Sequence, residues 1–423
     1  MGRSARDRAR TAVAGRDRVL DAARAFALGV VVLAHALAWD VGTGVPANVL
    51  DRRPDVAWLT WLLQVLPLFF AAGGIANATS WRREPDVAAF WRRRLLRLTT
   101  PALLYTSVWT AVLLPLAVVL PLAEPAGRFA AQLVWFLGVY AAVVVAAPWT
   151  VRWTARPWPT LAAWLVTVLA VDLLRWNVDP ALGWLNLLLV WGFAHQLGYH
   201  LPALRTAPRL RLLLGAVVAA TTAVALGVLG PYSAVLVSYV GDPEPSNLSP
   251  PTLVVALYAV AQVLGLAALW PWLDRRLAAD RLYLAVGAFG ARGIGIYLWH
   301  IPIVALVAGV AWWLGFDAAP LGAAWWAAHL LGVAVVLAGA WWLAGRAQAA
   351  ERRALARVSG WRAWRVPLAP VAVAVPLVLL SVSTTGFGTW WGAGMLGLPS
   401  SSLLDLALLA AAWRVLATSA APA

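Results

Sequence analysis

The sequence predicts an all-α protein, a polytopic bundle of about 10–12 transmembrane helices with its N-terminus in the cytoplasm. Apolar residues make up 62% of the 423 positions and charged residues only 12%, against about 25% charged residues in a typical soluble domain. The apolar residues form runs of roughly 20, the length that one helix needs to cross a bilayer. Many of the 28 tryptophans lie near the ends of these runs, where indole rings anchor helices at the membrane surface.

Ten runs between residues 19 and 345 are long and apolar enough to span a bilayer. They cover approximately 19–39, 57–78, 99–122, 130–150, 159–175, 182–200, 212–230, 252–272, 293–313 and 322–345. An eleventh run covers 366–386. A weaker segment at 402–418 contains Asp405 and Arg414, so it either spans, lies in the interface or packs on the bundle.

The 33 basic residues, all of them arginine, support this division independently. With alternating spans, 27 arginines fall in cytoplasmic segments and only four fall outside, as the positive-inside rule requires. They form short bursts and no continuous basic face, so the net charge of +15 does not indicate nucleic-acid binding. We expect a basic cytoplasmic tail at 1–18, a ten-span membrane domain at 19–345, an Arg-rich cytoplasmic linker at 346–365 and an extension at 366–423 with one or two further membrane helices.

The first span carries three ionisable residues, Asp21, Arg24 and His35, and such residues inside a membrane are candidates for function because they are costly there. Arg24 and His35 are eleven residues apart, so they share one helix face and stand roughly 16 Å apart along the axis. Asp21 lies within about 40° of the same line. This stripe indicates a polar path through the bundle. The alternative is that Arg24 snorkels to the interface and His35 hydrogen-bonds a neighbouring helix.

A basic cluster precedes the third span, in the run Arg92-Arg93-Arg94-Leu95-Leu96-Arg97. Arg94 and Arg97 share a helix face at i, i+3. With Arg93 they are candidates for gripping phosphate groups, because a guanidinium donates several coplanar hydrogen bonds to phosphate oxygens. An Arg-rich inner loop that sets topology and touches anionic lipid would have the same composition.

Other polar residues within the spans have simpler interpretations. Asp172 and Arg175, at i, i+3 near the outer end of the fifth span, predict a local ion pair. His300 either faces the same cavity as the first-span stripe or makes a structural hydrogen bond. No cysteine is present, which excludes disulfides, thiolate metal sites and cysteine nucleophiles. We expect no bound metal ion and no permanently bound cofactor.

These residues resemble the motifs of the acyltransferase 3 family of integral-membrane O-acyltransferases. The stretch DRVLDAARAFALGVVVLAH is similar to the family's first-span motif, an Arg and then a His after ten residues, matched by Arg24 and His35. The run RRRLLRL is similar to its Arg-x-x-Arg motif, matched by Arg94 and Arg97. LPLFFAAGGIA, LVWFLGVY and YLWH add similarity, and SNLSPPTL resembles a segment of an actinobacterial subgroup. The resemblance covers roughly residues 15–345, with Arg24-Ala25 in place of the usual Arg-Gly.

The resemblance implies transfer of an acyl group from a cytoplasmic donor, typically acyl-CoA, to a hydroxyl of an envelope glycan, lipid or other small acceptor. In that scheme Arg94 and Arg97, with Arg93, hold the donor phosphates. Arg24 lies deeper in the path, and His35 acts as general base on the acceptor hydroxyl, for which an imidazole is suited at neutral pH. The expected partners are the acyl donor, the acceptor and membrane lipids, and the expected location is the plasma membrane of a bacterium.

Further candidates for lining the cavity or contacting the acceptor are Asp21, Trp135, Asn247 and His300. Two other classes of protein compete with the enzyme. One is a multi-pass transporter or exporter of a lipid or glycan without acyl-transfer activity. The other is an inactive scaffold, which the cost of an unused Arg–His stripe in the bilayer disfavours.

Overall fold

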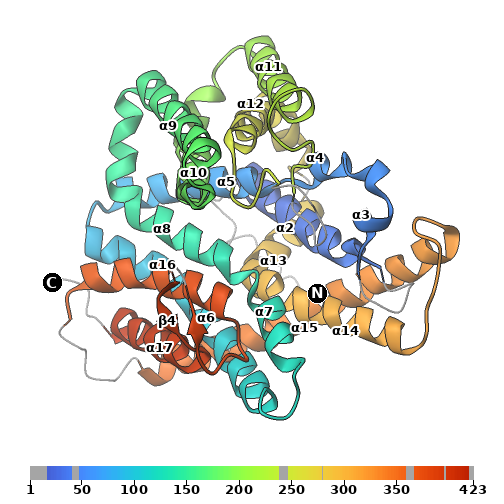
Figure 1. Ribbon diagram of the computed structural model, residues 1–423. Helices are drawn as coiled ribbons and strands as arrows, with labels where there is room; N and C mark the ends of the chain where they lie inside the picture. The colour runs from blue at the N-terminus through green and yellow to red at the C-terminus, as the bar shows by residue number, and fades with distance from the viewer. Residues whose placement is uncertain are drawn as a thin grey trace. The chain divides into compact units, whose positions relative to one another are not determined.

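The computed structural model describes residues 17–40, 47–237, 246–278, 280–358, 366–394 and 397–418 (Figure 1). Ten helical segments in this part of the chain are long and apolar enough to cross a membrane, which confirms a polytopic all-α membrane protein. They are Arg18–Ala38, Leu59–Arg83, Val87–Leu116, Ala123–Ala155, Pro157–Asn177, Arg209–Val228, Leu253–Arg276, Gly293–Trp313, Ala323–Val358 and Leu368–Thr385.

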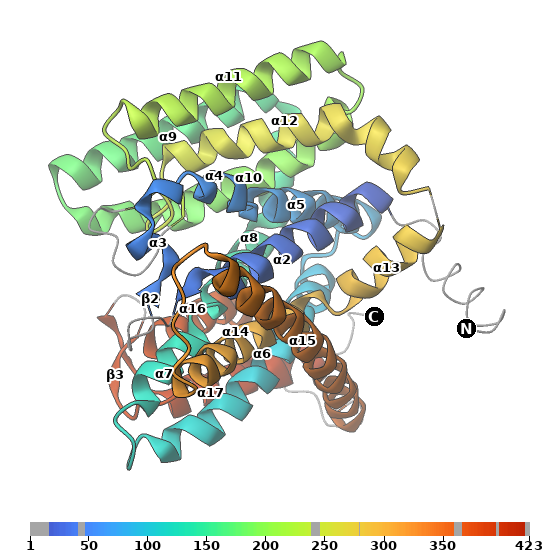
Figure 2. The ribbon, with the colours of Figure 1, turned by 90° about the vertical axis from the view of Figure 1, so that its right-hand side faces the viewer.

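The chain divides into two compact units, which we describe separately. The first unit comprises residues up to Asp40 and the segments Ala47–Ala76 and Trp153–Gly293. Its elements are α2 (Arg18–Ala38), β1 (Trp39–Asp40), β2 (Ala47–Asn48), α3 (Val49–Arg52), η1 (Pro54–Val56), α4 (Leu59–Leu63), the first part of α5 (Leu66–Arg83), most of η2 (Val151–Ala155), α9 (Pro157–Asn177), η3 (Pro180–Leu185), α10 (Asn186–Leu204), α11 (Arg209–Val228), α12 (Leu253–Arg276) and α13 (Asp280–Ala291). Helices α11 and α12 lie side by side in it (Figure 2).

Helix α2 begins where its sequence provides a cap. The Asp17 carboxylate accepts hydrogen bonds from the backbone N–H groups of Val19 and Leu20, at 3.1 and 3.2 Å, and so satisfies two of the donors that a helix start leaves open. The helix ends at Ala38, because the next residue, Trp39, has an extended backbone. Trp39 and Asp40 form β1, which pairs with β2 in a two-residue antiparallel ribbon. One continuous helix therefore carries the whole Asp21–His35 stripe.

Helix α10 corresponds to the predicted span at 182–200 but is not among the ten apolar segments. Polar side chains lower its apolarity, and three of them, Asn186, His195 and Gln196, are buried. Protein, rather than lipid, therefore surrounds much of this helix, which packs against α9 and α12.

Helices α5 and α10 approach each other closely at Gly74 and Gly198. A Cβ atom at Gly74 would lie 2.1 Å from the carbonyl oxygen of His195, and one at Gly198 would lie 2.0 Å from that of Ala71. Beside this crossing, the rings of Phe70 and Trp191 stack with centroids 4.9 Å apart. Only glycine allows the two backbones to meet here.

Replacing Gly198 by alanine is therefore expected to lower the free energy of unfolding by about 1–3 kcal/mol, because the added methyl group overpacks the crossing. Thermal unfolding of the purified protein in detergent measures the loss. Gly265→Ala in α12 is the matched control, since a Cβ atom there meets nothing within 4 Å. Equal melting temperatures for the two variants would contradict the role of the glycine crossing.

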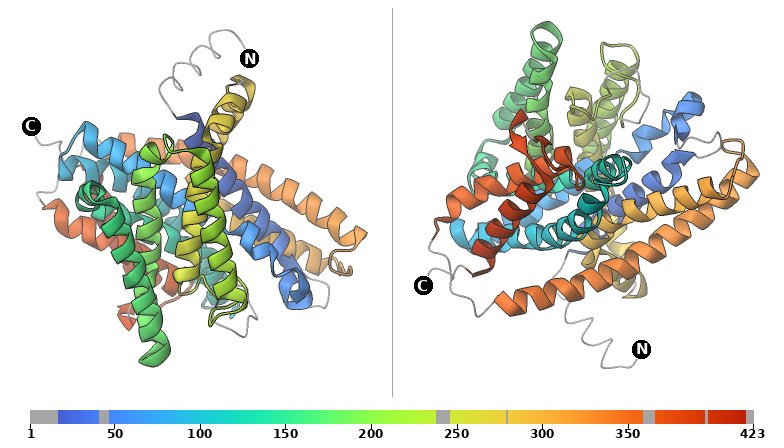
Figure 3. Two further views of the ribbon diagram at one scale, coloured as in Figure 1. Left: turned by 90° about the horizontal axis from the view of Figure 1, so that it is seen from above. Right: turned by 60° about the horizontal axis from the view of Figure 1, so that its bottom comes forward.

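The second unit comprises, within the described residues, 77–152 and 294–418. Its elements are the remainder of α5, α6 (Val87–Leu116), α7 (Ala123–Ala131), α8 (Val134–Thr150), α14 (Gly293–Trp313), α15 (Ala323–Val358), α16 (Leu368–Thr385), β3 (Gly392–Ala393), β4 (Pro399–Ser400) and α17 (Ser402–Thr418). The C-terminal extension is built into this unit. Helices α16 and α17 lie side by side (Figure 3), α16 packs on α8, and α17 packs on α6.

Helix α15 is longer than its predicted span at 322–345. Its 36 residues correspond to about 54 Å, well beyond the ~30 Å hydrocarbon core of a bilayer. The first part of the predicted linker, up to Val358, is thus a helical continuation, because its Ala, Arg, Gln and Glu residues are strong helix formers. Residues 359–365 lie outside the described part of the chain.

Candidate active site

The N-terminal part of the α2 stripe, Asp21 and Arg24, is held by its neighbours within the first unit. One guanidinium nitrogen of Arg24, Nη2, donates to the carbonyl oxygen of Ala72 in α5, and the other, Nη1, lies 3.8 Å from the Asp21 carboxylate. The hydroxyl of Tyr283 in α13 lies 3.4 Å from the second Asp21 oxygen. Asp21 is buried, whereas 30% of the Arg24 side chain is exposed. The structure thus brings Asp21 and Arg24 together and orients Arg24.

His35 lies in the last turn of α2 and is half-buried. The helix is continuous from Arg18 to Ala38, so the spacing argument holds and His35 shares a face with Arg24. Its ring hydrogen-bonds the backbone of Val31, one turn earlier. A neutral imidazole that donates one N–H to a carbonyl keeps its other nitrogen as a basic acceptor.

The arginine cluster lies on α6, which begins twelve residues before the predicted start of the span because Asp86 caps it by accepting from the N–H of Ala89. The structure distinguishes the three candidate arginines. Arg93 forms an ion pair with Glu84. The Arg94 guanidinium lies 6.0 Å from the ring centre of Phe90, within the range of a cation–π contact.

Arg97 differs from the other two. Its side chain is exposed, and it forms no hydrogen bond or ion pair with any residue that the structure describes. A guanidinium in this state can direct its donors at a ligand from outside the protein without first breaking an internal contact. Arg97 is therefore the cluster member best prepared to bind an anionic group.

His300 and Trp135 also belong to the second unit. His300 is fully buried in α14, and its Nδ1 lies 2.7 Å from the carbonyl oxygen of Tyr297, so the structural hydrogen bond is present. The Tyr297 hydroxyl donates to the carbonyl oxygen of Leu133, at 3.0 Å, and joins α14 to the start of α8. Trp135 is half-buried in the first turn of α8.

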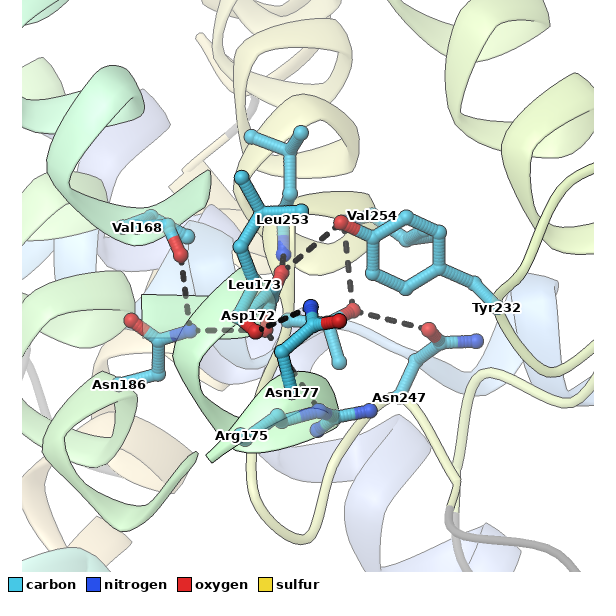
Figure 4. A network of polar contacts seen from close by, with 11 residues as sticks. Val168, Asp172, Leu173, Arg175, Asn177, Asn186, Tyr232, Asn247, Leu253 and Val254 are labelled. Atoms are coloured by element: carbon cyan, nitrogen blue, oxygen red, sulfur yellow. Dashed lines mark hydrogen bonds and ion pairs between the residues drawn. The ribbon is translucent and has the colours of Figure 1, made fainter. Parts of the chain in front are cut away.

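Asn247 lies in the first unit, in the loop before α12, where it is 1% exposed. Its amide nitrogen donates to the carbonyl oxygens of Ser233 and Val235, at 2.6 and 2.9 Å. Its amide oxygen accepts from the Thr252 hydroxyl at 2.8 Å (Figure 4). These bonds hold the loop together and occupy both ends of the amide.

A buried network around Asp172 extends beyond the predicted local ion pair (Figure 4). The Asp172 carboxylate accepts from the Asn186 amide, the Tyr232 hydroxyl and the backbone N–H of Leu253, at 3.0, 3.0 and 2.9 Å. Arg175 is more distant, with Nε 3.9 Å from the carboxylate. The i, i+3 spacing could reveal only Arg175, because the other three donors come from distant parts of the sequence.

Tyr232, in the loop after α11, stays protonated in this network. Burial raises the pKa of Tyr232 well above its ordinary value, and the neighbouring Asp172 carboxylate raises it further. The phenol therefore keeps its proton at neutral pH and donates it to the hydrogen bond with Asp172. The network joins α9, the loop and the start of α12 within the first unit.

The predicted site residues thus form two groups. Asp21, Arg24, His35 and Asn247 belong to the first unit, and Arg93, Arg94, Arg97, Trp135 and His300 belong to the second. Within the described residues no three His, Cys, Asp or Glu side chains gather as a metal site would require.

The family model described as an acyltransferase domain, that of the acyltransferase 3 family, matches residues 17–345. The match covers well over half of the chain and includes α2 and α6, the two helices that carry the Arg24–His35 and Arg94–Arg97 motifs. No curated protein and no solved structure matches the chain significantly. The chain therefore belongs to the acyltransferase 3 family and is a multi-pass membrane acyltransferase.

Proposed function

We propose that the protein transfers an acyl group from cytoplasmic acyl-CoA to a hydroxyl of an envelope glycan, lipid or other small acceptor, in a bacterial plasma membrane. We choose acyl-CoA as the donor because of the surroundings of the Arg97 side chain. Its guanidinium is exposed and has no internal partner among the described residues. Coenzyme A offers phosphate oxygens that guanidinium groups bind through charge-assisted hydrogen bonds.

Arg94 and Arg97 share one face of α6 and act together in this proposal. Arg94 lies against Phe90, which restricts its side chain, while Arg97 is free to close on the ligand. Arg93 contributes less to donor binding, because its ion pair with Glu84 must be weakened before it can bind a phosphate.

His35 is the proposed general base. As the acceptor oxygen attacks the thioester carbonyl carbon, the basic ring nitrogen takes the hydroxyl proton. The new C–O bond forms, the C–S bond breaks, and the imidazolium returns its proton to the departing coenzyme A thiolate. Arg24, fixed by Asp21 and the Ala72 carbonyl, supplies positive charge on the same face of α2.

Replacing Arg97 by alanine is expected to weaken coenzyme A binding by about 10- to 100-fold, the loss of one or two charge-assisted hydrogen bonds. Titration of the purified protein with coenzyme A, and release of free thiol from acetyl-CoA, measure binding and donor use. Arg357→Ala is the matched control, an exposed arginine on α15 of the same unit. Wild-type protein that does not bind coenzyme A, or an Arg97 variant that binds it unchanged, would refute this donor.

A further inference from the structure

We propose that Trp413, in the C-terminal extension beyond the family match, is a positioning residue for the α6 turn that carries Arg97. It holds this turn through Thr100. The effect on donor binding rests on the proposed function of Arg97, whereas the effect on the turn itself does not. Trp413 lies outside residues 17–345, so the inference assigns a role to a part of the chain that the family domain does not include.

The contact is a hydrogen-bonded relay within the second unit. Trp413 is 9% exposed, and its indole Nε1–H donates to the Thr100 hydroxyl oxygen at 2.9 Å. The same hydroxyl donates to the backbone carbonyl oxygen of Leu96, at 2.7 Å. The relay therefore connects α17 to the carbonyl group next to Arg97.

The turn at Arg97 needs such support because the helix ladder is incomplete there. Pro101 has no N–H, so the carbonyl of Arg97 lacks its partner four residues later. Thr99 and Thr100 direct their hydroxyls back to the carbonyls of Leu95 and Leu96, an arrangement that tends to bend helices. The direction in which the Arg97 side chain points thus depends on the hydrogen bonds that these two hydroxyls make.

Helix α17 is itself firmly fixed at its start. The Ser402 hydroxyl accepts from the Thr389 N–H at 3.0 Å, and its single hydrogen is shared between the Gly386 and Thr389 carbonyl oxygens, each 3.0 Å away. The Ser400 hydroxyl donates to the Asp405 carboxylate at 2.8 Å. Its N-terminal end is tied to the α16–α17 connection, and the helix packs on α16 and α6, so α17 supports Trp413 where that side chain meets α6.

Trp413→Phe and Thr100→Val test the relay, because each keeps most of the side-chain volume and removes one hydrogen-bonding group. Trp413→Phe removes one hydrogen bond and is expected to raise KM for acetyl-CoA and Kd for coenzyme A by about 3- to 10-fold, while kcat stays within about twofold. Thr100→Val removes the bonds to both Trp413 and Leu96, so its effect should be at least as large. The double variant should be no worse than Thr100→Val alone, since Thr100→Val already breaks the whole relay. Thr99→Val is the matched control, because its hydroxyl has the same type of bond to Leu95 but no bond to Trp413.

A second readout does not depend on any ligand. The chain contains no cysteine, so Arg97→Cys provides a single site for a nitroxide spin label, whose mobility reports the order of the turn. Trp413→Phe should increase that mobility and Thr99→Val should not. If the wild type does not bind coenzyme A, the proposed function fails, and the label alone then decides whether Trp413 holds the turn.

Two outcomes would overturn the inference. One is unchanged label mobility together with unchanged coenzyme A binding in Trp413→Phe. The other is an equal decrease in melting temperature and activity in Trp413→Phe, Thr100→Val and the control Thr99→Val. That result would indicate only a structural contribution from this part of α6.

Discussion

Glutamine in place of His35 is expected to reduce acyl transfer by about 10²–10⁴-fold, the usual contribution of a general base, while the protein remains folded and inserted. The glutamine amide can still hydrogen-bond the Val31 backbone, but it has no basic nitrogen to accept a proton. Transfer of label from acetyl-CoA to the membrane fraction measures the rate. Mass spectrometry of envelope glycans and lipids from wild-type and His35→Gln strains should reveal one missing acyl mass, which would identify the acceptor.

The matched control for this prediction is His329→Gln in α15. His329 is also half-buried, and its Nδ1 lies 2.9 Å from the Trp325 carbonyl oxygen one turn earlier. The same chemical change at this position should leave acyl transfer within about twofold of wild type. Full activity of His35→Gln would refute the assignment of His35.

Replacing Asp172 by asparagine is expected to lower the free energy of unfolding by about 3–5 kcal/mol, the usual cost of removing one partner of a buried charged group. Asp172 is fully buried and accepts from Asn186, Tyr232 and the Leu253 N–H. A neutral amide cannot accept all three bonds, and it leaves Arg175 without its carboxylate. Thermal unfolding in detergent measures the change.

Asp179→Asn provides the comparison. Asp179 is exposed and caps η3 by accepting from the Ala181 N–H, so its replacement should cost at most about 1 kcal/mol. Tyr232→Phe removes one bond to Asp172 and should fall between the two, near 1 kcal/mol. Equal melting temperatures for all three variants would show that the Asp172 network does not stabilise the first unit.

Much of the fold follows from local patterns in the sequence. Runs of about 20 apolar residues predict spanning helices because a bilayer leaves the backbone few alternatives, and the structure confirms helices at these runs. Helix periodicity likewise places Arg24 and His35 on one face of α2, since their relation depends on a single continuous helix. The Arg–His and Arg-x-x-Arg motifs are local too, and they predicted the family.

The ends of the helices were less predictable from the sequence, because capping residues and helix-forming polar residues extend helices beyond their apolar runs. Helix α6 starts at Val87 rather than 99, which places the arginine cluster on the helix itself. Helix α15 continues to Val358. Hydropathy responds to the apolar part of each helix and not to these polar turns.

The sequence alone determined that this protein is an all-α membrane acyltransferase with a polar stripe on its first helix, because spacing and apolarity are properties of neighbouring residues. Only the tertiary structure decided that Arg93 is paired and Arg97 is available, since side-chain partners depend on packing. It alone joined Trp413 to Thr100, residues 313 positions apart, and gave Asp172 its partners. Hydrogen bonds between distant segments form only when the helices pack, and no local pattern encodes them.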